Sequence, residues 1–153
     1  MSKRVNNMVS TPRKIDNPAI VAPDASTRLN QLCPDVANWP QSWSYEPADI
    51  APGQRIVDYL KPFLLHLLDQ NLATKTLHRH RDSLWMLGGE VIRRRQEDTR
   101  LRKLAVEKAV FELLEEEGGP LIWPRISESA QLSFDATCRK LYRYVKTTEL
   151  GLK

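Results

Sequence analysis

Residues 62–95 read PFLLHLLDQNLATKTLHRHRDSLWMLGGEVIRRR and predict an apolar helix, a short polar turn and a second helix rich in basic residues. The apolar positions of the first helix recur every three or four residues, which is the period of a helix packed on a core. We expect this helix to begin near Pro52 and to end at about Gln70. Pro62 removes one backbone donor, so we expect it to bend or split the helix. The predicted buried stripe is Ile56, Tyr59, Leu60, Phe63, Leu64, Leu67 and Leu68.

The second helix is expected to follow a tight turn. Asn71 is a suitable C-terminal stop for the first helix, and the Thr74 hydroxyl is placed to cap the second. From Lys75 onward, apolar residues repeat every seven positions and form the buried side of the helix. Gly88 and Gly89 interrupt this pattern and predict a bend or the close approach of another helix. The basic residues of the second helix are Lys75, His78, Arg79, His80, Arg81, Arg93, Arg94 and Arg95.

Residues 63–84 resemble part of the N-terminal core-binding (SAM-like) domain of tyrosine recombinases and phage integrases. That domain has a helix with the pattern F-L-x-x-L, a turn similar to L-S-x-x-T, and a helix that opens with basic residues. The chain has the first pattern at residues 63–67 and the second at residues 72–76, where Ala73 replaces the common serine. The tyrosine that is common in the next helix is replaced around His80.

The resemblance implies a helical, non-catalytic module that lays two helices across adjacent grooves of double-stranded DNA. In tyrosine recombinases, the nucleophile and its assisting residues lie in a separate C-terminal domain, and this chain ends where that domain would begin. The resemblance therefore implies a DNA-binding protein associated with a mobile genetic element. It also leaves room for a protein partner that supplies a catalytic function.

The composition is that of a mildly basic globular protein with one domain. The chain has 153 residues, a net charge of +4 and a pI near 9.2, which permits a polyanionic partner without demanding one. Cys33 and Cys138 show neither a disulfide pattern nor metal-type spacing to a histidine. No apolar run has the character of a secretory signal or the length of a membrane span. We expect a soluble cytoplasmic protein, associated with the nucleoid if it binds DNA, without a metal, a cofactor or a membrane partner.

Residues 1–51 are expected to form a proline-rich, extended leader, and residues 52–153 a helical domain. Six prolines in the leader oppose helices longer than one or two turns. Trp39 and Trp43 are expected to clip the later part of the leader onto the helical body. The alternative for this segment is a basic arm that reaches along a phosphate backbone.

The rest of the chain predicts further helices. Asp98 or Thr99 is placed to cap a third helix that runs through Leu114 and ends at residues 118–120, GGP. Ser133 is placed to cap the last helix, whose outer face is basic. With no convincing strand and no internal repeat, we predict an all-α, compact bundle of four to five helices.

No constellation of residues predicts catalysis, so we expect a protein that is not an enzyme. His78 and Arg81 form a His-x-x-Arg pair, and Tyr142 and Tyr144 are candidate nucleophiles. The pair lies in the region that resembles a non-catalytic domain, and the rest of a recombinase site has no candidates. DNA binding is the stronger interpretation, because a helix that enters a groove needs cations for phosphates and side chains that reach base edges.

The predicted DNA-binding residues lie at the start and end of the second helix and on the outer face of the last helix. The alternative function is that of a helical adaptor, which binds a protein through apolar residues 121–123 or acidic residues 115–117 and has no nucleic-acid ligand. The predicted DNA-binding residues are Lys75, Thr76, Arg79, His80, Arg81, Arg93, Arg94, Arg95, Arg139, Lys140 and Arg143.

Overall fold

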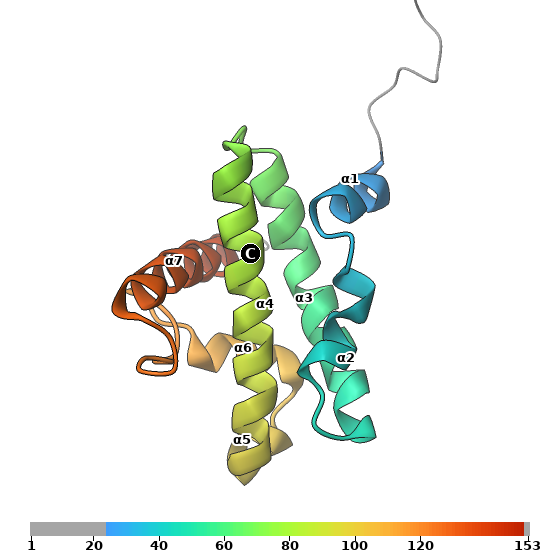
Figure 1. Ribbon diagram of the computed structural model, residues 1–153, viewed down its shortest axis with the longest axis vertical. Coiled ribbons are helices and arrows are strands. Elements are labelled where there is room, and N and C mark those ends of the chain that lie inside the picture. The colour runs from blue at the N-terminus through green and yellow to red at the C-terminus, as the bar shows by residue number, and fades with distance from the viewer. Residues whose placement is uncertain (1–23, 152–153) are drawn as a thin grey trace, which may run out of the picture.

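The structure is a computed structural model that describes residues 24–151. These residues form α-helices and two short 3-10 helices, and the described part has no strand, only an isolated bridge between Glu115 and Gly118 (Figure 1). The predicted all-α fold is therefore confirmed. The elements are α1 (Ala25–Leu32), η2 (Val36–Asn38), α2 (Trp39–Trp43), η3 (Pro47–Asp49), α3 (Ile50–Leu68), α4 (Thr74–Glu97), α5 (Thr99–Lys103), α6 (Val106–Leu113) and α7 (Glu128–Gly151).

Helices α3 and α4 form an antiparallel pair at the centre of the molecule (Figure 1). Helices α1 and α2 lie along α3 on one side, α7 packs across α4 on the other, and α6 packs against α3. Within the part of the chain that the structure covers, no helix has both the length and the apolar character of a membrane span. The largest fully buried side chains are Phe63, Phe134, Ile56, Leu60, Leu64, Leu67, Leu84, Leu87, Ile92 and Leu141.

The helix–turn–helix prediction is confirmed in outline, but its predicted cap is wrong. Asn71 ends the turn with a φ of 58°, a conformation that asparagine tolerates better than most residues. Helix α3 continues through Pro62 without a break, so of the two predicted outcomes the split does not occur, and the bend stays a prediction. The N-cap of α4 is Ala73, which makes no side-chain capping hydrogen bond, so Thr74 is the first residue of the helix and does not cap it.

The predicted extended leader is wrong for the described residues from Asp24 onward. The Asp24 carboxylate accepts a hydrogen bond from the Thr27 N–H at 2.8 Å and caps α1. Pro40 and Pro47 fall in the first turn of α2 and η3, where a missing N–H does no harm, so these prolines permit helices. The helical body therefore begins at α1, before the predicted boundary at residue 52. The rest of the predicted leader, residues 1–23, lies outside the described residues.

The tryptophan anchor predicted for the leader is confirmed. Trp39 and Trp43 are both buried, with ring centroids 5.8 Å apart. The Trp43 indole N–H donates to the Trp85 carbonyl on α4 at 2.9 Å. Its ring lies against Gly88, where a Cβ atom would overlap the indole. Close packing therefore explains the glycine pair, and α4 continues through it as one helix.

The predicted third helix is in fact two helices. The Asp98 carboxylate caps α5 through the Arg100 N–H at 2.9 Å, as predicted, but the helix breaks after Lys103 and α6 then ends at Leu113. Helix α7 begins at Glu128, so Ser133 is an internal residue and not a cap.

Candidate nucleic-acid interface

A buried hydrogen bond joins α4 to α7. The Nδ1 atom of His80 and the Oγ1 atom of Thr137 are 2.7 Å apart, and both residues are buried. Burial lowers the pKa of His80, and the positive charges of Lys140 and Arg79 lower it further. Lys140 on α7 and Arg79 on α4 therefore lie close enough to the same imidazole to act on it from two helices. This junction brings together basic residues that are far apart in the sequence.

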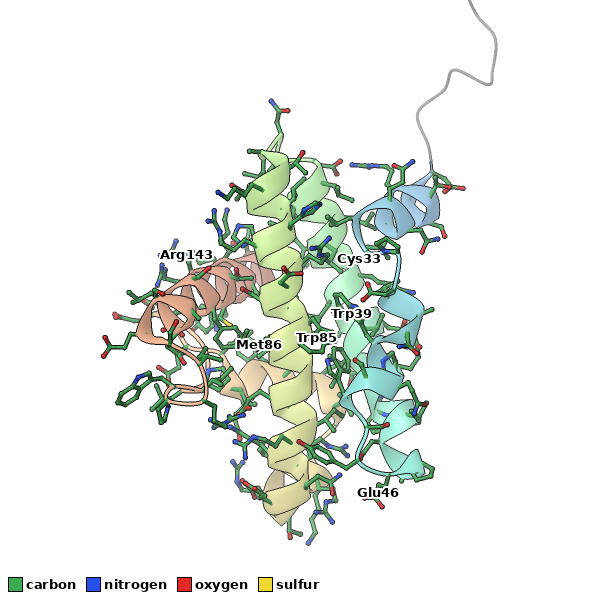
Figure 2. The ribbon with its side chains drawn as sticks, in the orientation of Figure 1. Cys33, Trp39, Glu46, Trp85, Met86 and Arg143 are labelled. Atoms are coloured by element: carbon green, nitrogen blue, oxygen red, sulfur yellow. The ribbon has the colours of Figure 1, made fainter. Side chains whose placement is uncertain are left out.

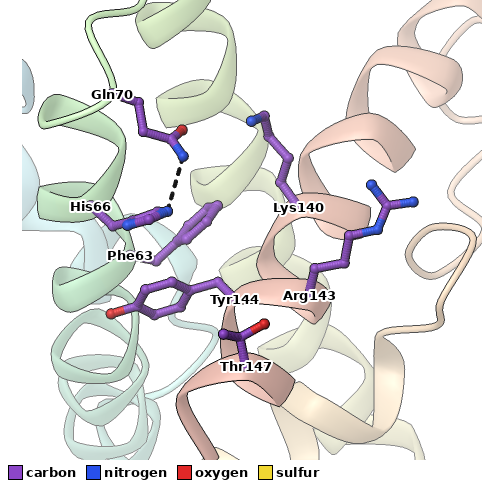
Figure 3. Close-up of a pocket in the computed structure, with 7 residues that line it drawn as sticks. All are labelled: Phe63, His66, Gln70, Lys140, Arg143, Tyr144 and Thr147. Atoms are coloured by element: carbon purple, nitrogen blue, oxygen red, sulfur yellow. Dashed lines mark hydrogen bonds between the residues drawn. The ribbon is translucent and has the colours of Figure 1, made fainter. Parts of the chain in front are cut away.

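A cleft of about 270 Å³ opens between α3 and α7 beside this junction (Figure 3). Its inner side is aromatic, because the ring centroid of Tyr144 lies 5.3 Å from that of Phe63 and 4.8 Å from that of His66. Lys140 and Arg143 project from α7 along its other side. The aromatic contacts hold α7 on α3, and they fix the position from which both cations leave the helix.

Five of the predicted DNA-binding residues define what we call the α4–α7 cationic face: Lys75, Thr76 and Arg79 on the first turns of α4, and Lys140 and Arg143 on α7. Among residues 24–148, Lys75, Lys140 and Arg143 form no ion pair or hydrogen bond through their side chains. Arg79 makes only a long hydrogen bond of 3.4 Å to the Thr76 hydroxyl. These cations are not neutralised by carboxylates of the described chain. They retain the charge that a phosphate backbone would bind.

Two other residues predicted on the first turns of α4 are structural. His80 is 6% exposed and its ring is committed to Thr137, so the imidazole does not reach the surface. Arg81 pairs with Asp82 at 2.9 Å and donates to the Leu32 carbonyl at 3.1 Å. The second contact ties the end of α1 to α4. Both residues are on the inner side of the helix because α4 carries packing partners on more than one face.

The arginine run at the end of α4, which is predicted to bind phosphates, has partners within the protein. Glu90 is buried, and its carboxylate accepts hydrogen bonds from Arg93 at 2.8 Å and from Arg94 at 2.6 Å. Arg125, from the segment before α7, donates to the same carboxylate at 2.8 Å. Arg95 is half-buried, and burial lowers its pKa. Arg93 and Arg94 therefore belong to an internal charge cluster, and phosphate binding by the run stays a prediction.

Arg139 also has an internal role. Its Nη1 group donates to the Glu117 carbonyl at 3.0 Å and holds the loop after α6 against α7. Sequence reasoning missed Glu90 as the centre of the arginine cluster. The signal was present, because Glu90 precedes Arg93 by three residues and Arg94 by four, the spacing of ion pairs on one helix.

The two candidate tyrosine nucleophiles pack against different aromatic rings. Tyr142 stacks on Phe111 with ring centroids 5.4 Å apart, whereas Tyr144 packs in the aromatic cleft. Cys33 and Cys138 are both buried, and burial raises the pKa of both thiols, that of Cys33 to about 12. Buried, protonated thiols are poor nucleophiles and poor metal ligands. Within the described chain, no three histidine, cysteine or acidic residues form a metal-binding group.

Comparisons of the chain with protein-family models, with curated proteins and with solved structures find no match.

Proposed function

We propose that this chain is a non-catalytic protein that binds double-stranded DNA through the α4–α7 cationic face. The observation that carries the proposal is the His80–Thr137 contact, which joins α4 to α7 one residue from Arg79 and three residues from Lys140. A rigid pair of helices with unneutralised cations can bind phosphates on both sides of a groove without first ordering its own side chains.

The start of α4 adds to this surface. Ala73 provides no side-chain cap, so the first N–H groups of a 24-residue helix retain their capacity to donate. The positive end of the helix dipole lies at the same place, next to Lys75 and Thr76. A phosphate bound here would receive hydrogen bonds from the backbone and a charge from Lys75. The Thr76 hydroxyl can also donate a hydrogen bond to a phosphate, although it carries no charge.

The wider biological role is part of the same proposal. The resemblance of residues 63–84 to core-binding domains supports an accessory protein of a mobile genetic element, acting in the cytoplasm with a separate catalytic partner. The proposal excludes His80, Arg81, Arg93 and Arg94, whose side chains are engaged within the protein.

A charge-matched comparison tests the proposed surface. We expect Arg79→Gln/Arg143→Gln to weaken binding to duplex DNA by about tenfold or more, because two phosphate contacts are lost. The control is Arg55→Gln/Arg100→Gln, which removes the same charge from exposed arginines paired with Glu107 and Glu112. Equal weakening in both variants would show that only net charge matters and would overturn the assignment of this face.

A specific observation also supports the adaptor alternative. Leu121, Trp123 and Leu132 are exposed large apolar side chains, and together they line a groove of about 320 Å³. The loop that carries the first two is held rigidly by buried Gln131, which accepts hydrogen bonds from the N–H groups of Ile122 at 2.8 Å and Trp123 at 2.9 Å. Its Nε2 group donates to the Pro120 carbonyl at 3.2 Å.

This groove therefore has the composition of a protein-binding surface, with rigidly presented apolar residues that include a tryptophan. The adaptor proposal predicts a complex that survives nuclease treatment and is lost in Leu132→Ser/Trp123→Ser. Partners that are recovered only through nucleic acid, or that bind the variant equally well, would contradict it.

A further inference from the structure

A separate pocket of about 440 Å³ lies between the end of α2, the middle of α4 and residues 122–126. Figure 2 shows Trp85 on the side of α4 that faces α2, and Met86 on the side that faces α7. The volume is within the range of small-molecule sites. No residue of the α4–α7 cationic face lines this pocket. An inference about the pocket therefore does not depend on the proposed DNA binding.

One wall of the pocket is aromatic and held in place. Trp85 is 42% exposed and Tyr45 is 63% exposed, although both are large side chains. The Trp85 indole N–H donates to the Ser42 hydroxyl at 2.9 Å, and that hydroxyl donates to the Trp39 carbonyl at 2.7 Å. The indole plane is thus fixed by a chain of hydrogen bonds before any ligand arrives. Such preorganised aromatic surface favours stacking of a planar ring.

Arg93, Arg125 and the carboxylate of Glu90 line the pocket, and they belong to a charge cluster that continues outside it through Arg94 and Glu97. Three guanidinium groups, those of Arg93, Arg94 and Arg125, surround the single buried carboxylate of Glu90. Glu97 pairs with Arg93 at 3.3 Å and offsets a second positive charge. Three cations against two carboxylates leave one positive charge unbalanced within this cluster. A ligand with one negative group would balance it.

Arg125 is the arginine best placed to meet such a ligand. Its side chain is half exposed and lines the pocket, and only its Nη2 group is engaged, with Glu90. The Nε and Nη1 groups make no hydrogen bond to any residue that the structure describes. An apolar ligand would cut these donors off from water without replacing the lost hydrogen bonds, whereas an anionic group would accept from them.

We propose that this pocket binds a small molecule in which a planar aromatic ring carries a phosphate or a carboxylate. The ring stacks on Trp85 and Tyr45, and the anionic group accepts hydrogen bonds from Arg125. Ring and charge are both required, because the pocket joins an apolar wall to an uncompensated cation. A mononucleotide and an aryl carboxylic acid share this chemistry.

The test uses the full-length protein labelled with ¹⁵N, in which NMR resolves the indole N–H signals of its tryptophans. The probes are adenosine monophosphate and indole-3-acetate. The corresponding parts are adenosine and indole, which lack the anionic group, and inorganic phosphate, which lacks the ring. We expect at least one anionic ring compound to shift the Trp85 signal and leave that of Trp123, outside the pocket, unmoved. Each corresponding part should bind at least about tenfold more weakly. The tighter of the two anionic probes identifies the class of ligand.

Arg125→Met should weaken binding of that probe by about tenfold or more, whereas Arg55→Met, at an exposed arginine outside the pocket, should not. The signals of the other tryptophans report whether the variant is folded. No shift of Trp85 by either anionic probe at millimolar concentration would overturn the proposal. Equal binding by Arg125→Met, or binding of inorganic phosphate alone as tight as that of the nucleotide, would overturn it too. If Arg125→Met does not fold, the proposal is tested on the wild-type protein alone, by comparing the affinities of the two anionic ring compounds with those of adenosine, indole and inorganic phosphate.

Discussion

The indole ring of Trp43 occupies the space that a side chain at position 88 would need, so Gly88 is required for α2 to pack on α4. An added Cβ would overlap several ring atoms of Trp43 and would force the two helices apart. The same ring anchors α2 through its hydrogen bond to the Trp85 carbonyl. The N-terminal helices therefore depend on a glycine in the centre of α4.

Gly88→Ala should destabilise the protein by up to about 2 kcal/mol, because an overpacking cost of about 1–3 kcal/mol outweighs the roughly 1 kcal/mol that alanine gains over glycine within a helix. Gly89→Ala is the control. Its Cβ would lie 3.2 Å from the nearest Trp43 atom, so we expect a smaller loss or a gain. Urea unfolding measures both variants, and a stabilised Gly88→Ala variant would show that the ring does not pack there.

The Glu90 cluster predicts a loss of stability in acid. Burial raises the pKa of Glu90, but hydrogen bonds from Arg93, Arg125 and Arg94 outweigh this effect and lower the pKa to about 2 from 4.5. The unfolded chain binds the proton more tightly, so the contribution is complete above pH 4.5 and is lost as the pH falls through 2. This loss should be on the order of 3 kcal/mol in the free energy of unfolding.

Glu90→Gln should lack this part of the acid dependence, and it should also be less stable at neutral pH because the half-buried Arg93 and Arg94 and the more exposed Arg125 lose their counter-charge. Urea unfolding at pH values from 6 down to 2 measures both effects. Glu128→Gln, at an exposed position, is the control. A Glu90→Gln variant with the same acid dependence as the wild type would contradict the assignment of the low pKa.

The pKa of His80 reports directly on the α4–α7 cationic face. Burial is the main cause that lowers it, and the charges of Lys140 and Arg79 add to the effect. Lys140→Gln should therefore raise this pKa, whereas Arg102→Gln on α5 should leave it unchanged. NMR titration of the histidine signals measures the shift. An unchanged pKa in Lys140→Gln would mean that Lys140 does not lie near the junction in solution.

We expect the side chain of Gln131 to hold the apolar loop at residues 121–123 in its conformation. Gln131→Ala leaves the N–H groups of Ile122 and Trp123 without their partner, and we expect a loss of about 2–4 kcal/mol in the free energy of unfolding. Gln41→Ala, at an exposed position on α2, should have little effect. Thermal unfolding of the two variants makes the comparison, and similar midpoints would show that the loop holds its shape without Gln131.

The central helix pair was predictable because its signals are local. The apolar period of residues 56–68 and the turn residue Asn71 both act within a few positions of the chain. The helices before α3 are not predicted from the sequence because prolines generally oppose helices, whereas Pro40 and Pro47 lie in first turns, where helices accept them. The anchoring role of Trp39 and Trp43 was predictable because two neighbouring large aromatic side chains gain free energy when they are buried against the helical body.

The candidate site was predicted only in part, because periodicity does not show which basic residues find carboxylates. Lys75 and Arg143 remain exposed, but Arg94 is bound by a glutamate four residues earlier. His80 looked like a surface residue among arginines, and only the crossing of α7 buries it against Thr137. That contact joins residues 57 positions apart and leaves no local trace in the sequence.

The most direct test of the α4–α7 cationic face is the salt dependence of binding to a labelled DNA duplex, followed by fluorescence anisotropy. Each neutralised phosphate contributes about −0.9 to the slope of log affinity against log salt concentration. We predict that Arg79→Gln/Arg143→Gln flattens the slope by roughly 1.8, the value for two lost contacts, and that Arg55→Gln/Arg100→Gln keeps the wild-type slope. No binding at low salt, or a wild-type slope in the Arg79→Gln/Arg143→Gln variant, would contradict the proposed DNA-binding surface.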